Sequence, residues 1–226
     1  FRGRYVYAPH IDTLDDSPED GRSEKWHYTR WRTRLWGKFS LTEDIDFNAR
    51  LLNEWRTWDD PDRKPSSWNG DEIFFDRFNL EVRNFMDMPW KMVIGRQDII
   101  LGHGWLVLEG TQNDGSRTIF FDAIRNTFEL EDMDTTLDLI YINNVASLDK
   151  RFHPINDRDN EVSYTDSEGF IAYASNRSLV DNAKVDGYFI YKKDDEVYLD
   201  LDGAGTDAAR NALSKDSEIY TFGGLI

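Results

Sequence analysis

The stretch that decides the fold runs from Trp26 to Phe39 and reads WHYTRWRTRLWGKF. Alternate residues differ in kind along it. One set is basic at its centre, with Arg30, Arg32 and Arg34, and the other becomes aliphatic and aromatic towards Phe39. Side chains of a β-strand point alternately to the two faces of the sheet. The period of two therefore predicts a strand with one basic face and one apolar face.

The next two stretches repeat this pattern. In residues 46–58, one set of alternate positions carries the polar residues Asn48, Arg50, Glu54 and Arg56, together with Leu52. The other set carries Phe47, Ala49, Leu51 and Trp55, together with Asn53. In residues 72–84 the polar set is Arg77, Asn79, Glu81 and Arg83. The opposing set is Phe74, Phe78, Leu80 and Val82, with Asp76 as an exception. Neighbouring strands are thus expected to build a shared basic face.

Strand candidates continue to the end of the chain. They lie at residues 90–97, 118–129, 135–145, 169–176, 184–193 and 218–225, which gives about nine strands in all. Some connections are short, at 39–46, 85–89 and 131–134. Others have ten residues or more, and polar, acidic loops lie at 59–70, 112–117, 156–168 and 194–215. Short turns at one end of a sheet and long loops at the other are typical of an outer-membrane barrel.

Composition narrows the function classes. The chain of 226 residues has a net charge of −16, which argues against nucleic acid as a partner. It has no cysteine, which excludes disulfides, thiolate metal sites and cysteine nucleophiles. With 43 acidic residues, any pair of carboxylates is expected by chance, and no nucleophile motif is present. We therefore expect that the protein is not an enzyme.

The alternation fits two all-β architectures. A soluble sandwich also alternates apolar and polar residues, and a carbohydrate-binding module or enzyme of that kind is one alternative. The predicted strands are long, however, at about 10–14 residues, whereas strands of soluble proteins usually have about 5–6. No apolar run approaches the ~20 residues of a transmembrane helix. We therefore expect an antiparallel transmembrane β-barrel, with aromatic residues near the strand ends as interfacial girdles.

A barrel would turn the basic face towards its lumen. The predicted lumenal and solute-contacting residues are Arg30, Arg32, Arg34, Arg50, Arg56, Arg77, Arg83, Arg96, Arg125, Glu54 and Glu81. Guanidinium groups stay charged and bind carboxylates with two hydrogen bonds, so this lining would attract anions. The alternative is that the same residues form salt bridges that only hold the wall in shape. Both interpretations can hold together.

No cofactor is expected. The histidines His10, His27, His103 and His153 lack the spacing of a metal site. Asp200, Asp202 and Asp207 alternate with glycines and are weak candidates for Ca²⁺, although the closing Glu of an EF-hand is missing. A solvated acidic loop is the simpler interpretation of this segment.

From Gly95 onwards the chain resembles the alginate-export family of outer-membrane porins. The similarity rests on Gly95-Arg96-Gln97, on the following Leu101-Gly102-His103-Gly104, and on Phe121-Asp122-Ala123-Ile124-Arg125. Tyr188-Phe189-Ile190-Tyr191-Lys192, Tyr220-Thr221-Phe222-Gly223 and the early Arg-x-Arg-x-Arg strand are also similar to it. Ala123 replaces the more usual Gly. The resemblance implies a barrel of roughly eighteen strands that conducts an anionic polysaccharide through a positive lumen.

These expectations define one β-barrel domain over residues 1–226, with residues 1–22 as an N-terminal extension or periplasmic segment. About nine strands would make half of such a barrel, so the rest of a longer polypeptide or a second chain is expected to complete it. The expected location is the bacterial outer membrane. The expected partners are the lipid bilayer or lipopolysaccharide, an anionic or sugar-like solute, and a periplasmic or barrel-completing protein. A barrel that sheathes another protein is a third alternative.

Overall fold

The computed structural model describes residues 1–8, 26–60, 73–108, 120–146, 151–156, 166–195 and 216–226. Its strands are β1 (Arg2–Ala8), β2 (Trp26–Ser40), β3 (Ile45–Asp60), β4 (Ile73–Val82), β5 (Trp90–Gln97), β6 (Phe121–Leu130), β7 (Thr135–Asn144), β8 (Ser167–Asn176), β9 (Val185–Asp194) and β10 (Ser217–Leu225). Single 3-10 turns, η2 (Phe85–Asp87) and η3 (Glu131–Met133), join β4 to β5 and β6 to β7. No helix in the described part of the chain is long and apolar enough to cross a membrane.

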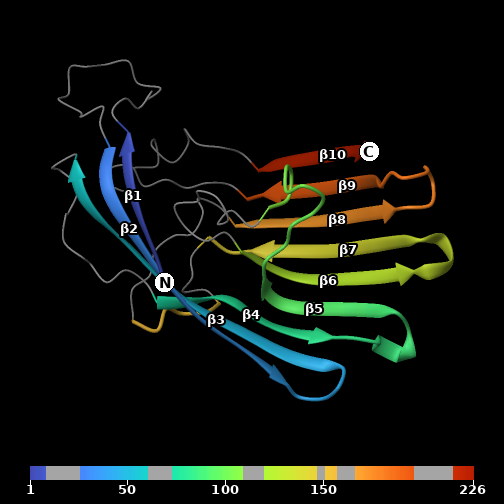
Figure 1. Ribbon diagram of the computed structural model, residues 1–226, viewed down its shortest axis with the longest axis horizontal. Coiled ribbons are helices and arrows are strands. Elements are labelled where there is room, and N and C mark those ends of the chain that lie inside the picture. The colour runs from blue at the N-terminus through green and yellow to red at the C-terminus, as the bar shows by residue number, and fades with distance from the viewer. Residues whose placement is uncertain (9–25, 61–72, 109–119, 147–150, 157–165, 196–215) are drawn as a thin grey trace.

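All ten strands belong to one antiparallel sheet in which each strand pairs with its neighbours in sequence (Figure 1). The all-β prediction is confirmed, and the predicted strands agree with the observed ones to within a few residues. A sandwich would need two sheets, whereas the described strands form one. The sheet is open, because β1 and β10 each pair on one side only among the described strands.

One strand was missed by the sequence patterns. Residues 2–8 of the expected N-terminal extension form β1, which pairs with β2 from Arg2 opposite Arg32 to Ala8 opposite Trp26. The extension is therefore wrong for this part, and residues 9–22 lie outside the described residues. With its alternating Arg2 and Arg4, β1 continues the pattern of the strand beside it.

The connections sort by length onto the two ends of the sheet. The short ones, residues 41–44, 83–89, 131–134 and 177–184, lie together at the right-hand end in Figure 1. The longer connections, residues 9–25, 61–72, 98–120, 145–166 and 195–216, all start from the opposite ends of the strands. An antiparallel sheet with neighbour pairing forces this separation whenever connection lengths alternate.

The two faces of the sheet differ in chemistry. On one, which we call the aromatic face, a single row of paired residues runs from β2 to β10. It consists of Phe39, Phe47, Leu80, Ile94, Ile124, Tyr141, Phe170, Tyr191 and Tyr220. The opposite face, which we call the arginine face, carries Arg30, Arg50, Arg77 and Arg125. Adjacent strands thus keep their alternation in register.

A β-bulge explains the exception at Asp76. Arg50 pairs with Arg77 while the next residue, Leu51, pairs with Phe75, so Asp76 is the extra residue. The bulge reverses the alternation upstream of it. Phe74 therefore lies opposite Leu52 on the arginine face, and not with Phe78 as the simple alternation predicts. The bulge also turns the Asp76 carboxylate towards the arginines.

The connection after β5 packs against the arginine face. Residues 98–108, which we call the 98–108 segment, leave β5 and cross β6 to β9 (Figure 1). Ile99, Leu101 and Val107 are buried against residues of the strands beneath them, namely Ala123, Ile140 and Ile171. A smaller buried cluster is formed by Leu52, Phe74 and Phe120. The main apolar core of the described chain thus lies between this segment and β6 to β8.

Candidate functional site

The arginine face is built as a lattice of ion pairs. On β2 and β3, both Arg30 and Arg32 bind the carboxylate of Glu54. Arg30 donates through Nε at 2.7 Å and Nη2 at 2.8 Å, and Arg32 donates through Nε at 2.6 Å. All three side chains are at most 10% exposed. One carboxylate thus joins two guanidinium groups across β2 and β3.

A second group of ion pairs joins β2, β3 and β4 to the root of the 98–108 segment. Arg50 donates from Nε to Asp76 at 2.6 Å and from both Nη atoms to Asp98 at 2.9 Å. Arg77 binds Asp98 as well, and Nη2 of Arg34 lies 3.2 Å from Asp76. Asp76 is completely buried, so its charge needs these partners. The bulge and the segment root are therefore held by the same arginine.

Further pairs continue towards the short turns and across the sheet. Asp46 binds Arg83 and also Lys38, whose Nζ lies 2.8 Å away. Hydrogen bonds to Asp46 and Glu81 raise the pKa of Arg83 above its usual value. On β6 and β7, Arg125 binds Asp138 through Nε at 2.8 Å and Nη2 at 2.9 Å.

Among the described residues, cations outnumber carboxylates on the β1–β4 part of this face. Arg4, Arg30 and Arg56 form one row across β1, β2 and β3. The guanidinium of Arg56 lies 5.2 Å from the ring centre of Tyr28, an aromatic contact instead of a carboxylate. The cations are Arg2, Arg4, Arg30, Arg32, Arg34, Lys38, Arg50, Arg56, Arg77 and Arg83; the carboxylates are Asp46, Glu54, Asp76, Glu81 and Asp98. Guanidinium groups held in fixed positions can bind anions.

The structure brings most of the predicted lumenal residues to one face. Arg30, Arg32, Arg34, Arg50, Arg56, Arg77, Arg83, Arg125, Glu54 and Glu81 all lie on the arginine face or contact it. The salt-bridge interpretation describes many of them well. The residues that the sequence analysis missed are the counter-charges Asp46, Asp76, Asp98 and Asp138 and the cations Arg2 and Arg4. Asp46 and Asp138 follow the period of two, so the alternation could have placed them on this face.

Arg96 is the exception among the predicted lumenal residues. It pairs with Phe78 on β4 and Asp122 on β6, in the register positions of the aromatic face. Its side chain is completely buried. The physical reason is the alternation within β5, which groups Arg96 with Trp90, Met92 and Ile94. Arg96 therefore does not belong to the basic lining.

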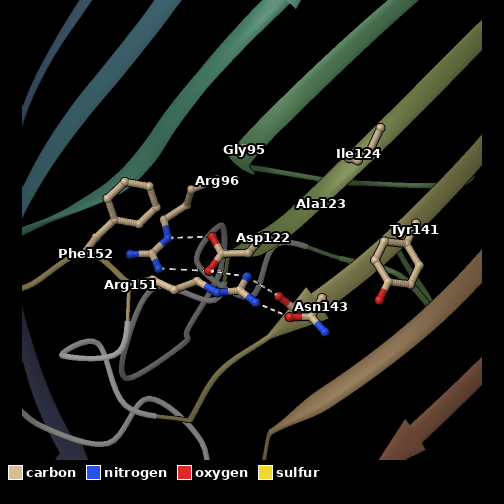
Figure 2. Close-up of a pocket in the computed structure, with 9 residues that line it drawn as sticks. All are labelled: Gly95, Arg96, Asp122, Ala123, Ile124, Tyr141, Asn143, Arg151 and Phe152. Carbon is tan, nitrogen blue, oxygen red and sulfur yellow. Dashed lines mark hydrogen bonds and ion pairs between the residues drawn. The ribbon is translucent and has the colours of Figure 1, made fainter.

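Arg96 instead forms a buried clamp with Asp122. Its Nε and Nη2 donate to the two carboxylate oxygens at 2.8 and 3.0 Å, and its Nη1 donates to the carbonyl oxygen of Phe75 at 2.9 Å. The guanidinium lies 3.7 Å from the ring centre of Phe120 and 4.7 Å from that of Phe152. Figure 2 shows Arg96 and Arg151 converging on Asp122 beside a pocket of about 230 Å³. Nε, Nη1 and Nη2 of Arg96 therefore all donate hydrogen bonds to other groups of the protein.

The clamp lies where β5 leaves β4. Beyond Arg96 the β4 strand continues without β5, so its backbone groups need other partners. Arg96 supplies one for Phe75, while the amide of Ile155 donates to the carbonyl of Ile73 at 2.7 Å. The amide of Ile73 in turn donates to Oδ1 of Asn156 at 2.8 Å. Arg96 and residues 151–156 thus supply hydrogen-bond partners for the edge of β4 that β5 leaves. The clamp between Arg96 and Asp122 therefore has a structural role.

Among the described residues, no group of three or more histidine, aspartate or glutamate side chains is placed to hold a metal ion. The calcium candidates Asp200, Asp202 and Asp207 lie outside the described residues. His27 contacts Asp59 at 3.7 Å, and His153 hydrogen-bonds the carbonyl of Pro154.

Comparisons of the chain with known protein families, with curated proteins and with solved structures find no match.

Proposed function

We propose that the sheet is part of the wall of a transmembrane β-barrel, a porin-like channel of the outer membrane that passes anionic or sugar-like solutes. The observation that carries the proposal is the division of the sheet into a continuous apolar row on one face and a cation-rich lattice on the other. A barrel wall in a membrane needs this division, with apolar side chains towards lipid and polar side chains towards the lumen.

The aromatic face supports contact with lipid. Large apolar side chains on it are exposed to a degree that is unusual for a soluble sheet, including Phe39 at 59%, Tyr220 at 61% and Phe222 at 82%. Strands β6 to β9 are each 10 residues long, which matches the ~9–11 residues of a tilted membrane-spanning strand. In water such a face would favour aggregation, whereas a hydrocarbon layer would solvate it.

The arginine face supports passage of anions. Its ion pairs hold the guanidinium groups in fixed positions, and the described residues of β1 to β4 place more cations than carboxylates on this face, which favours a positive potential. Low-dielectric walls focus such a field and raise the local concentration of anions. The mechanism is passive: the arginines attract the solute and the 98–108 segment narrows its path. The resemblance to alginate-export porins makes uronate oligomers the first polyanions to test.

Closure of the wall requires further strands. The edges of β1 and β10 have no partner among the described strands, and an unpaired edge in lipid leaves backbone groups without hydrogen bonds. We infer that additional strands, from the same polypeptide or from a second chain, pair with both edges.

The test is a planar-bilayer recording of the full-length protein under a salt gradient. We expect discrete conductance steps and a reversal potential on the anion-selective side. Arg4→Gln combined with Arg56→Gln removes charge from the Arg4, Arg30 and Arg56 row and should shift the reversal potential towards cations. The control is Lys193→Gln, because Lys193 lies two residues from Tyr191 on β9 and therefore belongs to the aromatic face. A folded protein without conductance, or one selective for cations, would refute the proposal.

A further inference from the structure

We propose that the pocket between the 98–108 segment and strands β8 to β10 is a stacking site for a hydroxylated ring, such as one pyranose unit of an oligosaccharide. The site deepens the proposed function, on which it rests, by naming the kind of solute that is retained on the arginine face. Its lining includes Trp105, Tyr173, Tyr188 and Ile190, and we call it the tyrosine pocket.

The wall of the pocket formed by the 98–108 segment is anchored at its root and along its base. Asp98 is held by the two ion pairs to Arg50 and Arg77. Ile99 is completely buried, and Leu101 and Val107 are 7% exposed. The amide of Leu101 donates to the carbonyl of Val107 at 3.1 Å, which closes the segment into a compact loop. A loop held in this way keeps its tip in a fixed position.

The opposite wall is a pair of parallel tyrosine rings. Tyr173 of β8 and Tyr188 of β9 are paired residues of the sheet, with ring centres 6.4 Å apart and an angle of 7° between the ring planes. The hydroxyl of Tyr173 donates to Oδ2 of Asp186 at 2.5 Å, and Lys184 binds the same oxygen at 3.1 Å. The orientation of the Tyr173 ring is thereby set by a charged partner.

Two glycines leave room for the tyrosine hydroxyls. A β-carbon at Gly102 would lie 2.8 Å from Oη of Tyr173, and Gly102 has a φ of 57°, which favours glycine. A β-carbon at Gly223 of β10 would lie 2.5 Å from Oη of Tyr188. A side chain at either position would displace a ring. The tyrosine hydroxyls therefore occupy space that is free because Gly102 and Gly223 have no side chain.

Trp105 lies at the tip of the segment and lines the same pocket. Its side chain is 83% exposed, although the base of its segment is buried. An indole held out from an anchored loop can stack on the apolar face of a ring, while the rim of the pocket offers the Tyr188 hydroxyl and the imidazole of His103. The pocket has a volume of about 300 Å³, at the lower limit of small-molecule sites. The lining combines Trp105 and two tyrosines with aliphatic side chains, and the aromatic rings can stack on the apolar face of a sugar ring.

The pocket lies on the path of a solute that moves along this face. On the other side of the segment, towards the long connections, is a second pocket of about 360 Å³ lined mainly by apolar residues, including Leu106, Phe121 and Ile171. Leu106 and Val107 line both pockets, so the segment divides the face into two hollows. A ring that leaves the second hollow would next meet Trp105 and the tyrosines.

The experiment measures binding and block separately on the full-length protein. Isothermal titration in detergent with a neutral glucose hexamer gives the affinity, and single-channel recording with the same oligomer gives the block. We expect Trp105→Ala to weaken both about ten-fold, in line with the loss of one stacking contact. Gly223→Ala should weaken both by displacing Tyr188. The matched control is Trp36→Ala. Trp36 lies on β2 opposite Arg50 of β3, is 73% exposed, and is outside the pocket.

The outcomes separate this site from the channel. Anion-selective conductance without binding or block by the hexamer would overturn the stacking site and leave the channel intact. Hexamer binding without any conductance would support the site and overturn the channel. Equal effects of Trp105→Ala and Trp36→Ala would also overturn the site. An unchanged melting temperature for both tryptophan variants shows that the comparison concerns folded protein.

Discussion

Arg96 of β5 and Asp122 of β6 stand directly opposite each other and form a double ion pair, with Nε–Oδ1 at 2.8 Å and Nη2–Oδ2 at 3.0 Å. Arg96 is fully buried and Asp122 is 6% exposed. Removing one partner of a buried pair leaves the other charge in a medium of low polarity, which costs more than the pair itself contributes. The clamp should therefore respond very differently to single and double substitutions.

Arg96→Met should destabilise the protein by roughly 3–5 kcal/mol, because Asp122 keeps its charge and the carbonyl of Phe75 loses its donor. The measurement is the urea midpoint of the purified protein in detergent. The control variant is Lys192→Met, since Lys192 is 52% exposed and its partner Asp194 is 20% exposed, so water can compensate the carboxylate. The double variant Arg96→Met with Asp122→Leu should recover much of the loss. A double variant as unstable as the single one would show that the clamp acts through something other than charge burial.

Gly95 allows β5 to approach β4. Its φ is 115°, and a β-carbon there would lie 2.4 Å from the carbonyl oxygen of Phe78, which is rigid backbone. Gly95→Ala should therefore cost at least about 1–3 kcal/mol of backbone strain, seen as a lower melting temperature. Gly187→Ala is the matched control, because no atom lies within 4 Å of a β-carbon built there. Equal losses from the two substitutions would contradict this account.

Asp98 connects the 98–108 segment to Arg50 and Arg77. Asp98→Asn should loosen the root, and we expect faster amide exchange in residues 99–107 together with a higher mean channel conductance. Glu81→Gln serves as control, because its partner Arg83 keeps the ion pair with Asp46. If amide exchange in the segment stays at the native rate, the ion pairs do not hold it.

The sheet was largely predictable because a period of two is a local property. Each of the expected strands exists, since alternation such as that from Arg30 to Phe39 survives in a sheet with one buried or lipid-facing side. The shortest element, Arg2–Ala8, was missed because seven residues give little periodic signal. The bulge at Asp76 was visible only as a break in the pattern, and its meaning required the register of β3.

The candidate site was predictable only in part. The alternation within β5 places Arg96 with Ile94 on the aromatic face and not in the lumenal set. Asp98 lies 48 residues from Arg50 in sequence and outside any strand, so no local pattern could pair them. The tyrosine pocket depends on a loop that returns across the sheet, which alternation does not encode. Local periodicity thus predicts the faces, and tertiary contacts decide what lies on them.

Ile99 and Ile100 test whether buried apolar side chains hold the 98–108 segment on the sheet. The two residues are adjacent and differ mainly in burial. Ile99 is 0% exposed in the core cluster, and Ile100 is 37% exposed. Ile99→Ala should cost about 2–5 kcal/mol, whereas Ile100→Ala should stay within about 1 kcal/mol. Limited proteolysis should cut residues 101–107 in the first variant and spare them in the second. Because the anchor is apolar, the loss in Ile99→Ala should persist at high salt. Cleavage in both isoleucine variants, or in neither, would mean that the segment is not held by its buried base.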